Sequence, residues 1–189
     1  MKKNILVKLA GIAAAVSLLV GGAYAAFTSN SVTITGVVLS SATPTLEVFD
    51  GSAWGNTTAD GNVLEITESN MYPGFVGVEH AFYLRNTSAA SVPFGQIVAN
   101  LPSGTGDWNA IKDVIQMRFG ETGTGWSTPW YTLSAWNSGP DDDDILLSEL
   151  PGGNTQRQFS VQFQMLSSAD DSAKGKSETF TLGFVGQTP

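Results

Sequence analysis

The single histidine, His80, is the residue with the most direct potential for catalysis. A zinc hydrolase of the thermolysin type needs two histidines one helical turn apart with a glutamate between them, and the chain has no second histidine. A Ser-His-Asp arrangement would also depend on His80, and no Gly-x-Ser-x-Gly motif precedes a predicted helix. His80 shares the two-residue period of Val78, Phe82 and Leu84 along a predicted strand. We therefore expect a partly buried structural side chain, and no enzyme.

Two other groups of residues could bind a ligand. Asp141 to Asp144 could hold calcium together with loop carbonyls, but they lack the glycine and the distal glutamate of the helix-loop-helix calcium site. A solvated acidic loop is the interpretation that we favour, and we expect no bound metal and no cofactor. Trp126, Trp130 and Trp136 lie among Gly, Ser and Thr residues. They could form a surface on which sugars stack, or they could pack at the rim of a sandwich.

Two tripeptides match the pattern for N-glycosylation, Asn56-Thr57-Thr58 and Asn86-Thr87-Ser88. This pattern is short and often accidental. No Gly-rich loop precedes a helix, so the sequence predicts no nucleotide site.

The composition indicates one domain that carries a strong negative charge. The 189 residues include no cysteine, which excludes disulfides and thiolate metal sites, and the formal net charge is −8. Three of the nine basic residues occupy the first eight positions, and without them six basic residues face 17 acidic ones, a charge of −11. Such a surface repels nucleic acid and anionic lipid, so we expect neither as a partner.

Residues 1–25 have the pattern of a secretory signal peptide. Lysines at positions 2, 3 and 8 precede the uncharged, apolar stretch from Leu9 to Tyr24. Ala23 and Ala25 supply the small side chains of a cleavage site, so the mature chain would begin at Ala26. An uncleaved anchor is the alternative, because Leu9 to Phe27 approaches the length that spans a bilayer. We favour cleavage, which predicts a secreted chain without a membrane segment and a single domain over residues 26–189.

A Pro-Gly turn followed by an alternating strand occurs twice. Tyr72-Pro73-Gly74 leads to residues 78–86, and Leu150-Pro151-Gly152 leads to residues 158–165. Apolar and polar residues alternate in both strands, as they do when one face of a sheet is dry and the other wet. Two such units predict a sandwich whose apolar faces pack together. We expect the core to include Phe82, Phe159, Val161, Phe163, Phe180 and Leu182.

Other segments of alternating or apolar sequence bring the expected total to about eight to ten strands, with turn signals between them. The expected strands include residues 32–39, 46–48, 63–67, 92–101, 115–119 and 180–184, and a strand within 130–136. Residues 110–114 could form one helical turn, and residues 50–62, which include Trp54, read as a surface loop. The predicted fold class is all-β, an antiparallel β-sandwich of the jelly-roll type.

With these residues placed, the sequence resembles the TasA/CalY (camelysin) family of exported biofilm-fibre proteins. Residues 1–30 look like the export signal that a SipW-type peptidase handles, and residues 30–39 look like the first mature strand of the family. Residues 72–88 resemble its Pro-Gly, strand and Asn-Thr-Gly-Ser segment, here without the glycine before Ser88. Residues 174–187 resemble its C-terminal segment, in which a Gly-x-Ser turn enters the last strand.

The resemblance implies a jelly-roll sandwich that is exported and assembles into matrix fibres, with the N-terminal strand of one subunit added to the sheet of the next. Camelysin is described as a metal-dependent protease, but this sequence has no His or Cys cluster that would support that activity. An adhesin, or a module that binds a glycan or calcium, is the alternative function. An exported protease is a weaker one. The expected partners are further copies of the chain and an extracellular polysaccharide.

The candidate assembly strand is the segment from Ala26 to Leu39, which contains no charged residue. Its apolar side chains are Phe27, Val32, Ile34, Val37 and Leu39. An uncharged apolar strand is an aggregation hazard unless it is paired. It can be paired in two ways, either by folding back into its own sandwich or by entering the sheet of a neighbouring copy.

Overall fold

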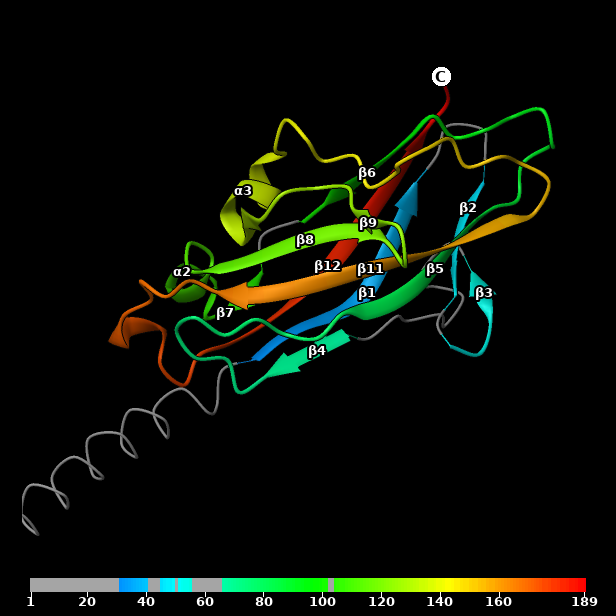
Figure 1. The fold of residues 1–189 in the computed structure, drawn as a ribbon. Coiled ribbons are helices and arrows are strands. Elements are labelled where there is room, and N and C mark those ends of the chain that lie inside the picture. The colour runs from blue at the N-terminus through cyan, green and yellow to red at the C-terminus, as the bar shows by residue number, and fades with distance from the viewer. Residues whose placement is uncertain (1–30, 41–44, 50, 56–65, 102–103) are drawn as a thin grey trace, which may run out of the picture.

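The computed structural model describes residues 31–40, 45–49, 51–55, 66–101 and 104–189, with the backbone alone for residues 35–40 and 105. Two β-sheets pack face to face (Figure 1). Within the described residues, sheet A has the order β4 (Ile66–Ser69), β1 (Ser31–Ser40), β12 (Ser177–Gln187) and β6 (Gln96–Asn100), and β7 (Thr105–Gly106) also pairs with β12. This architecture confirms the predicted all-β sandwich, whereas the jelly-roll connection stays a prediction.

Sheet B is the larger sheet. Its order is β10 (Tyr131–Thr132), β8 (Ile115–Glu121), β11 (Thr155–Met165), β5 (His80–Asn86), β2 (Leu46–Phe49) and β3 (Trp54–Gly55), and β9 (Gly125–Trp126) pairs with β8. In the part of the chain that the structure describes, three short helical segments lie outside the sheets: α2 (Trp108–Ile111), α3 (Leu133–Ser138) and the 3₁₀ turn η2 (Asp171–Ala173). Among the described strands β1 and β12 pair in parallel, and the other pairings are antiparallel.

Aromatic side chains from both sheets form the centre of the core. Phe82 of β5 stacks on Phe159 of β11 in the same sheet and on Phe184 of β12 in the opposite sheet, with ring centroids 5.8 and 5.3 Å apart. Phe119 of β8 meets Phe184 edge to face at 5.8 Å. All six predicted core residues are at most 3% exposed, so the alternation identified the buried faces correctly.

The two Pro-Gly units are not equivalent, and their strands do not face each other across the sandwich. Gly74 has φ +84° and closes a turn in which the N–H of Phe75 donates to the carbonyl of Tyr72 at 2.8 Å, as in a type II turn. In the second unit the positive φ falls on Gly153, at +77°. The strands that follow, β5 and β11, lie side by side in sheet B, so their apolar faces together cover sheet A.

Three predicted segments differ from the observed structure. The strand expected within residues 130–136 is limited to the two residues of β10, after which the chain turns into α3. Thr132 caps this helix, because its hydroxyl oxygen accepts the N–H of Ala135 at 3.2 Å. Trp54, expected in a surface loop, belongs to β3 and pairs with Phe49 of β2. The predicted helical turn occurs slightly earlier than expected, as α2.

Candidate functional site

The candidate assembly strand β1 lies inside sheet A, between β4 and β12 (Figure 1). It pairs in parallel with β12 along its whole length, and Ser31 to Ile34 also pair with β4. Val32 and Ile34 point into the core and are 1% and 0% exposed. Of the two arrangements that the sequence allows, this structure has the strand folded into its own sandwich, where Ser31 to Ile34 are paired on both sides.

The other predicted assembly residues are placed less completely. The backbone of Val37 pairs with Leu182 and that of Leu39 with Phe184, beyond a register shift between Ile34 and Gly36. The side chains of both residues lie outside the described part of the structure. Phe27 and the predicted cleavage residues Ala23, Ala25 and Ala26 also lie outside it, so processing stays a prediction.

The β4 side of this strand is fastened to sheet B by a histidine–carboxylate pair. Glu68 stands opposite Val32 and is 8% exposed. The Nε2 atom of His80, at the start of β5, lies 3.0 Å from Glu68 Oε2. A Cβ atom on Gly77 would lie 2.3 Å from the same oxygen, so the glycine allows this close approach. His80, with a side chain 22% exposed, is partly buried, as predicted.

On the other side of β1, Asp107 holds the first residues of β12 in place. Its carboxylate accepts the N–H of Ser177 at 3.2 Å and the ammonium group of Lys176 at 3.1 Å. The hydrogen bond from Ser177, followed by that from Lys176, holds the pKa of Asp107 below its usual value. The Ser31 N–H donates to the Lys176 carbonyl at 3.3 Å, which joins β1 to the same corner.

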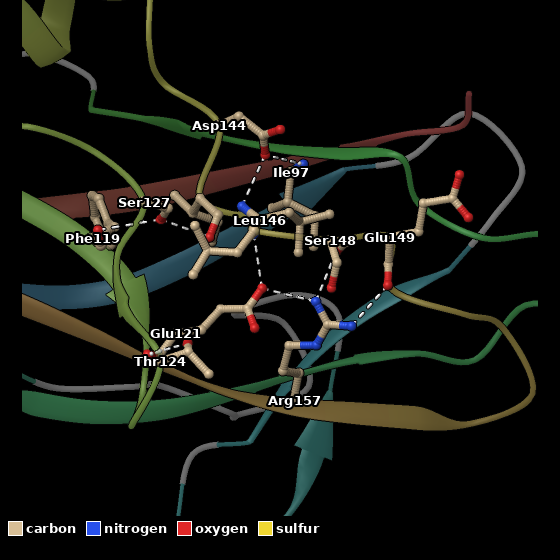
Figure 2. A network of polar contacts seen from close by, with 12 residues as sticks. Ile97, Phe119, Glu121, Thr124, Ser127, Asp144, Leu146, Ser148, Glu149 and Arg157 are labelled. Atoms are coloured by element: carbon tan, nitrogen blue, oxygen red, sulfur yellow. Dashed lines mark hydrogen bonds and ion pairs between the residues drawn. The ribbon is translucent and has the colours of Figure 1, made fainter.

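The acidic run forms part of a strap along the edge of β6. The Asp143 carbonyl accepts the N–H of Ala99, and Asp144 Oδ1 accepts the N–H groups of Ile97 at 3.1 Å and Leu146 at 2.9 Å (Figure 2). Burial raises the pKa of Asp143, and the neighbouring aspartates add to the effect. The Asp144 carboxylate therefore accepts hydrogen bonds from backbone N–H groups, while positions 141 and 142 are exposed.

A second carboxylate anchors the continuation of the strap on sheet B. Glu121 Oε1 accepts the N–H of Leu147 at 2.9 Å and Nη1 of Arg157 at 2.8 Å (Figure 2). Arg157 also donates to the carbonyls of Ser148 and Glu149, at 2.7 and 2.8 Å. The segment from Asp143 to Glu149 thus spans the two sheets. Sequence analysis missed Glu121 and Glu68, because a glutamate in a strand gives no signal of its tertiary partner.

The tryptophan-rich segment does not form one exposed platform. Trp136 is fully buried, and its Nε1–H donates to the Met117 carbonyl at 2.9 Å. The guanidinium carbon of Arg118 lies 3.9 Å from the ring centre of Trp126 and 4.3 Å from that of Trp130. The hypothesis that all three tryptophans form one sugar-stacking surface is therefore wrong, because Trp136 is a core residue.

The sequon at Asn86 is closed to modification in the folded chain. The Asn86 side chain is fully buried, and its Nδ2 donates to the carbonyls of Val92 at 2.9 Å and Leu150 at 3.1 Å. Its Oδ1 accepts the N–H of Ser88 at 3.0 Å. The side-chain amide therefore links three backbone segments, at Ser88, Val92 and Leu150, and is not accessible for glycosylation. Asn56 lies outside the described residues.

Within the described ranges, no three His, Asp or Glu side chains come together as a metal site, and no helix has the length and hydropathy needed to cross a bilayer. Around β1, the facing edges of β4 and β12 pair with an extended backbone, and the inward positions on it are filled by Val32 and Ile34. Comparison with protein-family models and with curated proteins found no match for this chain.

Proposed function

We propose that this chain is a secreted structural protein that assembles into extracellular fibres, with strand β1 of one copy added to sheet A of the next. The observation that carries the proposal is the position of β1. It is the first strand of the described chain, it has no charged residue, and it lies between β12, which has other strand partners, and β4, which a side-chain pair ties to sheet B.

The two flanking strands have their own attachments. β12 pairs with β6 and β7 on its other side and is fixed at its start by Asp107. β4 is attached to sheet B through the Glu68–His80 pair. If β1 left, the space between β4 and β12 would keep these supports and would expose the inward faces of Ile66, Phe180 and Leu182. Such an apolar slot is unstable unless a strand fills it.

The strand that fits this slot is the same strand from another copy. An exchanged strand makes the same hydrogen bonds and fills the same positions as the original, so exchange between copies changes few contacts and its extent depends on concentration. Because each copy gives its own strand and receives one from a neighbour, the contact is head to tail and propagates as a fibre when it does not close into a ring.

A disulfide between β1 and β4 tests this proposal. Thr33 and Thr67 are paired in the ladder, and their hydroxyl oxygens are 3.4 Å apart on the outward face. The natural chain has no cysteine, so Thr33→Cys with Thr67→Cys supplies the one possible pair. Oxidation of the monomer should lock β1 into its own sheet and stop fibre growth, and reduction should restore it. Fibres grown under reduction and then oxidised should give a covalent ladder of multimers on a denaturing gel.

The matched control is a second pair of cysteines in sheet B. Gln116 and Gln164 are paired between β8 and β11, and their side chains are hydrogen-bonded. Gln116→Cys with Gln164→Cys should leave fibre growth unchanged in both redox states. The proposal is wrong if the oxidised β1–β4 monomer elongates fibres as fast as the reduced one, or if oxidised fibres release only monomers.

A further inference from the structure

On the outward face of sheet B two arginines cover three tryptophan rings: Arg85 covers Trp54, and Arg118 covers Trp126 and Trp130. The guanidinium carbon of Arg85 on β5 lies 4.3 Å from the ring centre of Trp54 on β3. Arg118 on β8 stands in the same relation to Trp126 on β9, at 3.9 Å. A guanidinium at this distance is attracted to the ring and covers one of its faces. Each indole is thereby given a fixed position on the surface.

Both arginines are themselves held by a second partner. Arg85 Nε donates to Glu47 Oε2 at 3.0 Å, and its Nη2 donates to the same oxygen. Arg118 donates from Nε and Nη2 to the amide oxygen of Gln162, at 3.1 and 2.7 Å. Because the rings and arginines are already ordered, a ligand that binds them does not have to immobilise these side chains.

A hollow of about 280 Å³ lies next to Trp54, close to the lower end of the usual range for ligand sites, about 300 Å³. It is lined by Phe49, Trp54, Tyr83 and Gln156. The ladder places Phe49 opposite both Trp54 and Tyr83, so three aromatic residues form a row across β3, β2 and β5. Neighbouring ring centroids in this row are 5.3 and 6.4 Å apart. The hollow thus combines aromatic walls with one amide.

A second hollow, of about 210 Å³, lies next to Trp126 and is lined as well by Glu79, Glu121 and Ser160. The Ser160 hydroxyl lies 2.8 Å from that of Thr122. Glu121 is held by Arg157 (Figure 2), so its carboxylate has a fixed orientation. This hollow combines an indole with hydroxyl and carboxylate acceptors.

The two hollows lie along one strand. Gln156 and Ser160 are outward residues of β11 separated by four positions, which corresponds to roughly 13 Å at about 3.3 Å per residue. Gln158 is the outward residue between them. An extended polymer with repeating apolar faces and polar edges can occupy both hollows at once, whereas a small ligand can occupy only one.

We propose that this face of sheet B binds a linear, uncharged polysaccharide across both hollows. Sugar rings present a C–H face that packs on an aromatic side chain, and their hydroxyls can bond to the exposed amide of Gln156 and the exposed carboxylate of Glu79. The ligand is uncharged because glutamates line the second hollow and the whole chain carries a formal charge of −8, which repels a polyanion.

The test is affinity gel electrophoresis of the full chain, kept monomeric, through gels that contain hydroxyethyl cellulose, galactomannan, dextran or alginate. At least one of the three uncharged polymers should retard the chain, and the anionic alginate should not. Trp54→Ala and Gln156→Ala should each weaken binding at least fivefold. A hexasaccharide of the retarding polymer should bind at least tenfold more tightly than its disaccharide, because only the longer one spans both hollows.

Tyr72→Ala is the matched control, because Tyr72 is an aromatic residue that is 41% exposed and lines neither hollow. It should bind like the natural chain. Gln156 is an exposed residue, so its variant tests the site without removing packed rings. The proposal is overturned if none of the three uncharged polymers retards the chain, if alginate retards it most, or if Trp54→Ala and Gln156→Ala both bind as well as Tyr72→Ala.

Discussion

Replacing Ile34 by lysine should destabilise the chain far more than the same replacement one residue earlier. Ile34 is fully buried between Ile66 of β4 and Phe180 of β12, which are 4% and 3% exposed. Thr33 points to the outward face of the same strand. Ile34→Lys therefore places a positive charge on the inward face of sheet A, and Thr33→Lys places the same charge on its outward face.

The expected magnitude follows from two contributions. Loss of a buried isoleucine side chain costs about 2–5 kcal/mol, and an unpaired ammonium group in the core costs several kcal/mol more. The sum is at least about 5 kcal/mol, which is comparable with the whole stability of a typical domain, about 5–15 kcal/mol. An outward substitution such as Thr33→Lys should stay within about 0.5 kcal/mol.

Urea unfolding followed by tryptophan fluorescence measures both variants. With a urea dependence of about 2 kcal/mol per molar, the midpoint should fall by about 2.5 M or more for Ile34→Lys and by less than about 0.3 M for Thr33→Lys. Ile34→Lys should also fail to elongate fibres, since the charge enters an apolar slot in either arrangement. Equal midpoints for the two variants would show that the inward face of β1 is assigned wrongly.

Three further predictions concern the core, the strap and the buried amide. Phe163→Ala should lower the unfolding free energy by about 3–5 kcal/mol, as measured by urea titration, and a loss below about 1 kcal/mol would contradict its full burial. Burial raises the pKa of Asp143, so the charged carboxylate destabilises the folded state. Asp143→Asn should therefore raise the urea midpoint at pH 7. This gain should vanish when the pH falls below the pKa of an aspartate in the unfolded chain, about 3.9. Asn86→Ala should cost about 2–4 kcal/mol, because two buried carbonyls lose their donor, and mass spectrometry of the folded chain from a glycosylating host should find Asn86 unmodified.

The strands in which apolar and polar residues alternate strictly could be predicted, because this alternation alone shows which side chains face the core. In β11 the residues Phe159, Val161, Phe163 and Met165 face the core, as the period of two requires. Helix α3 was missed since its six residues mix Trp, Ser and Asn without a helical apolar stripe, and its start depends on the Thr132 cap. A short helix of this kind is stabilised by tertiary packing, here the burial of Trp136.

The polar contacts of the candidate sites could not be predicted from the sequence. Glu68 and His80 are 12 positions apart, and Arg85 and Glu47 are 38 apart, so neither pair follows a local spacing rule. The β1 segment could be predicted as a strand because its alternation and its lack of charged residues can be read from the sequence. Its parallel pairing with β12 could not be predicted in this way. The strand order of each sheet had to be known before Trp54 and Trp126 could be placed on one face.

The parallel pairing of β1 with β12 also determines when sheet A can be completed. Ser31 pairs with Ser177, 146 positions later, so sheet A cannot form until almost the entire polypeptide has been made. At about 5–20 residues per second, synthesis of that interval takes roughly 7–30 s. Contacts of such high sequence separation form late in folding. During this delay β1 has its β4 partner, through Ser31 to Ile34, but lacks its longer pairing with β12. In the assembly that we propose, this interval is the time at which β1 is open to pairing with the sheet of a neighbouring copy.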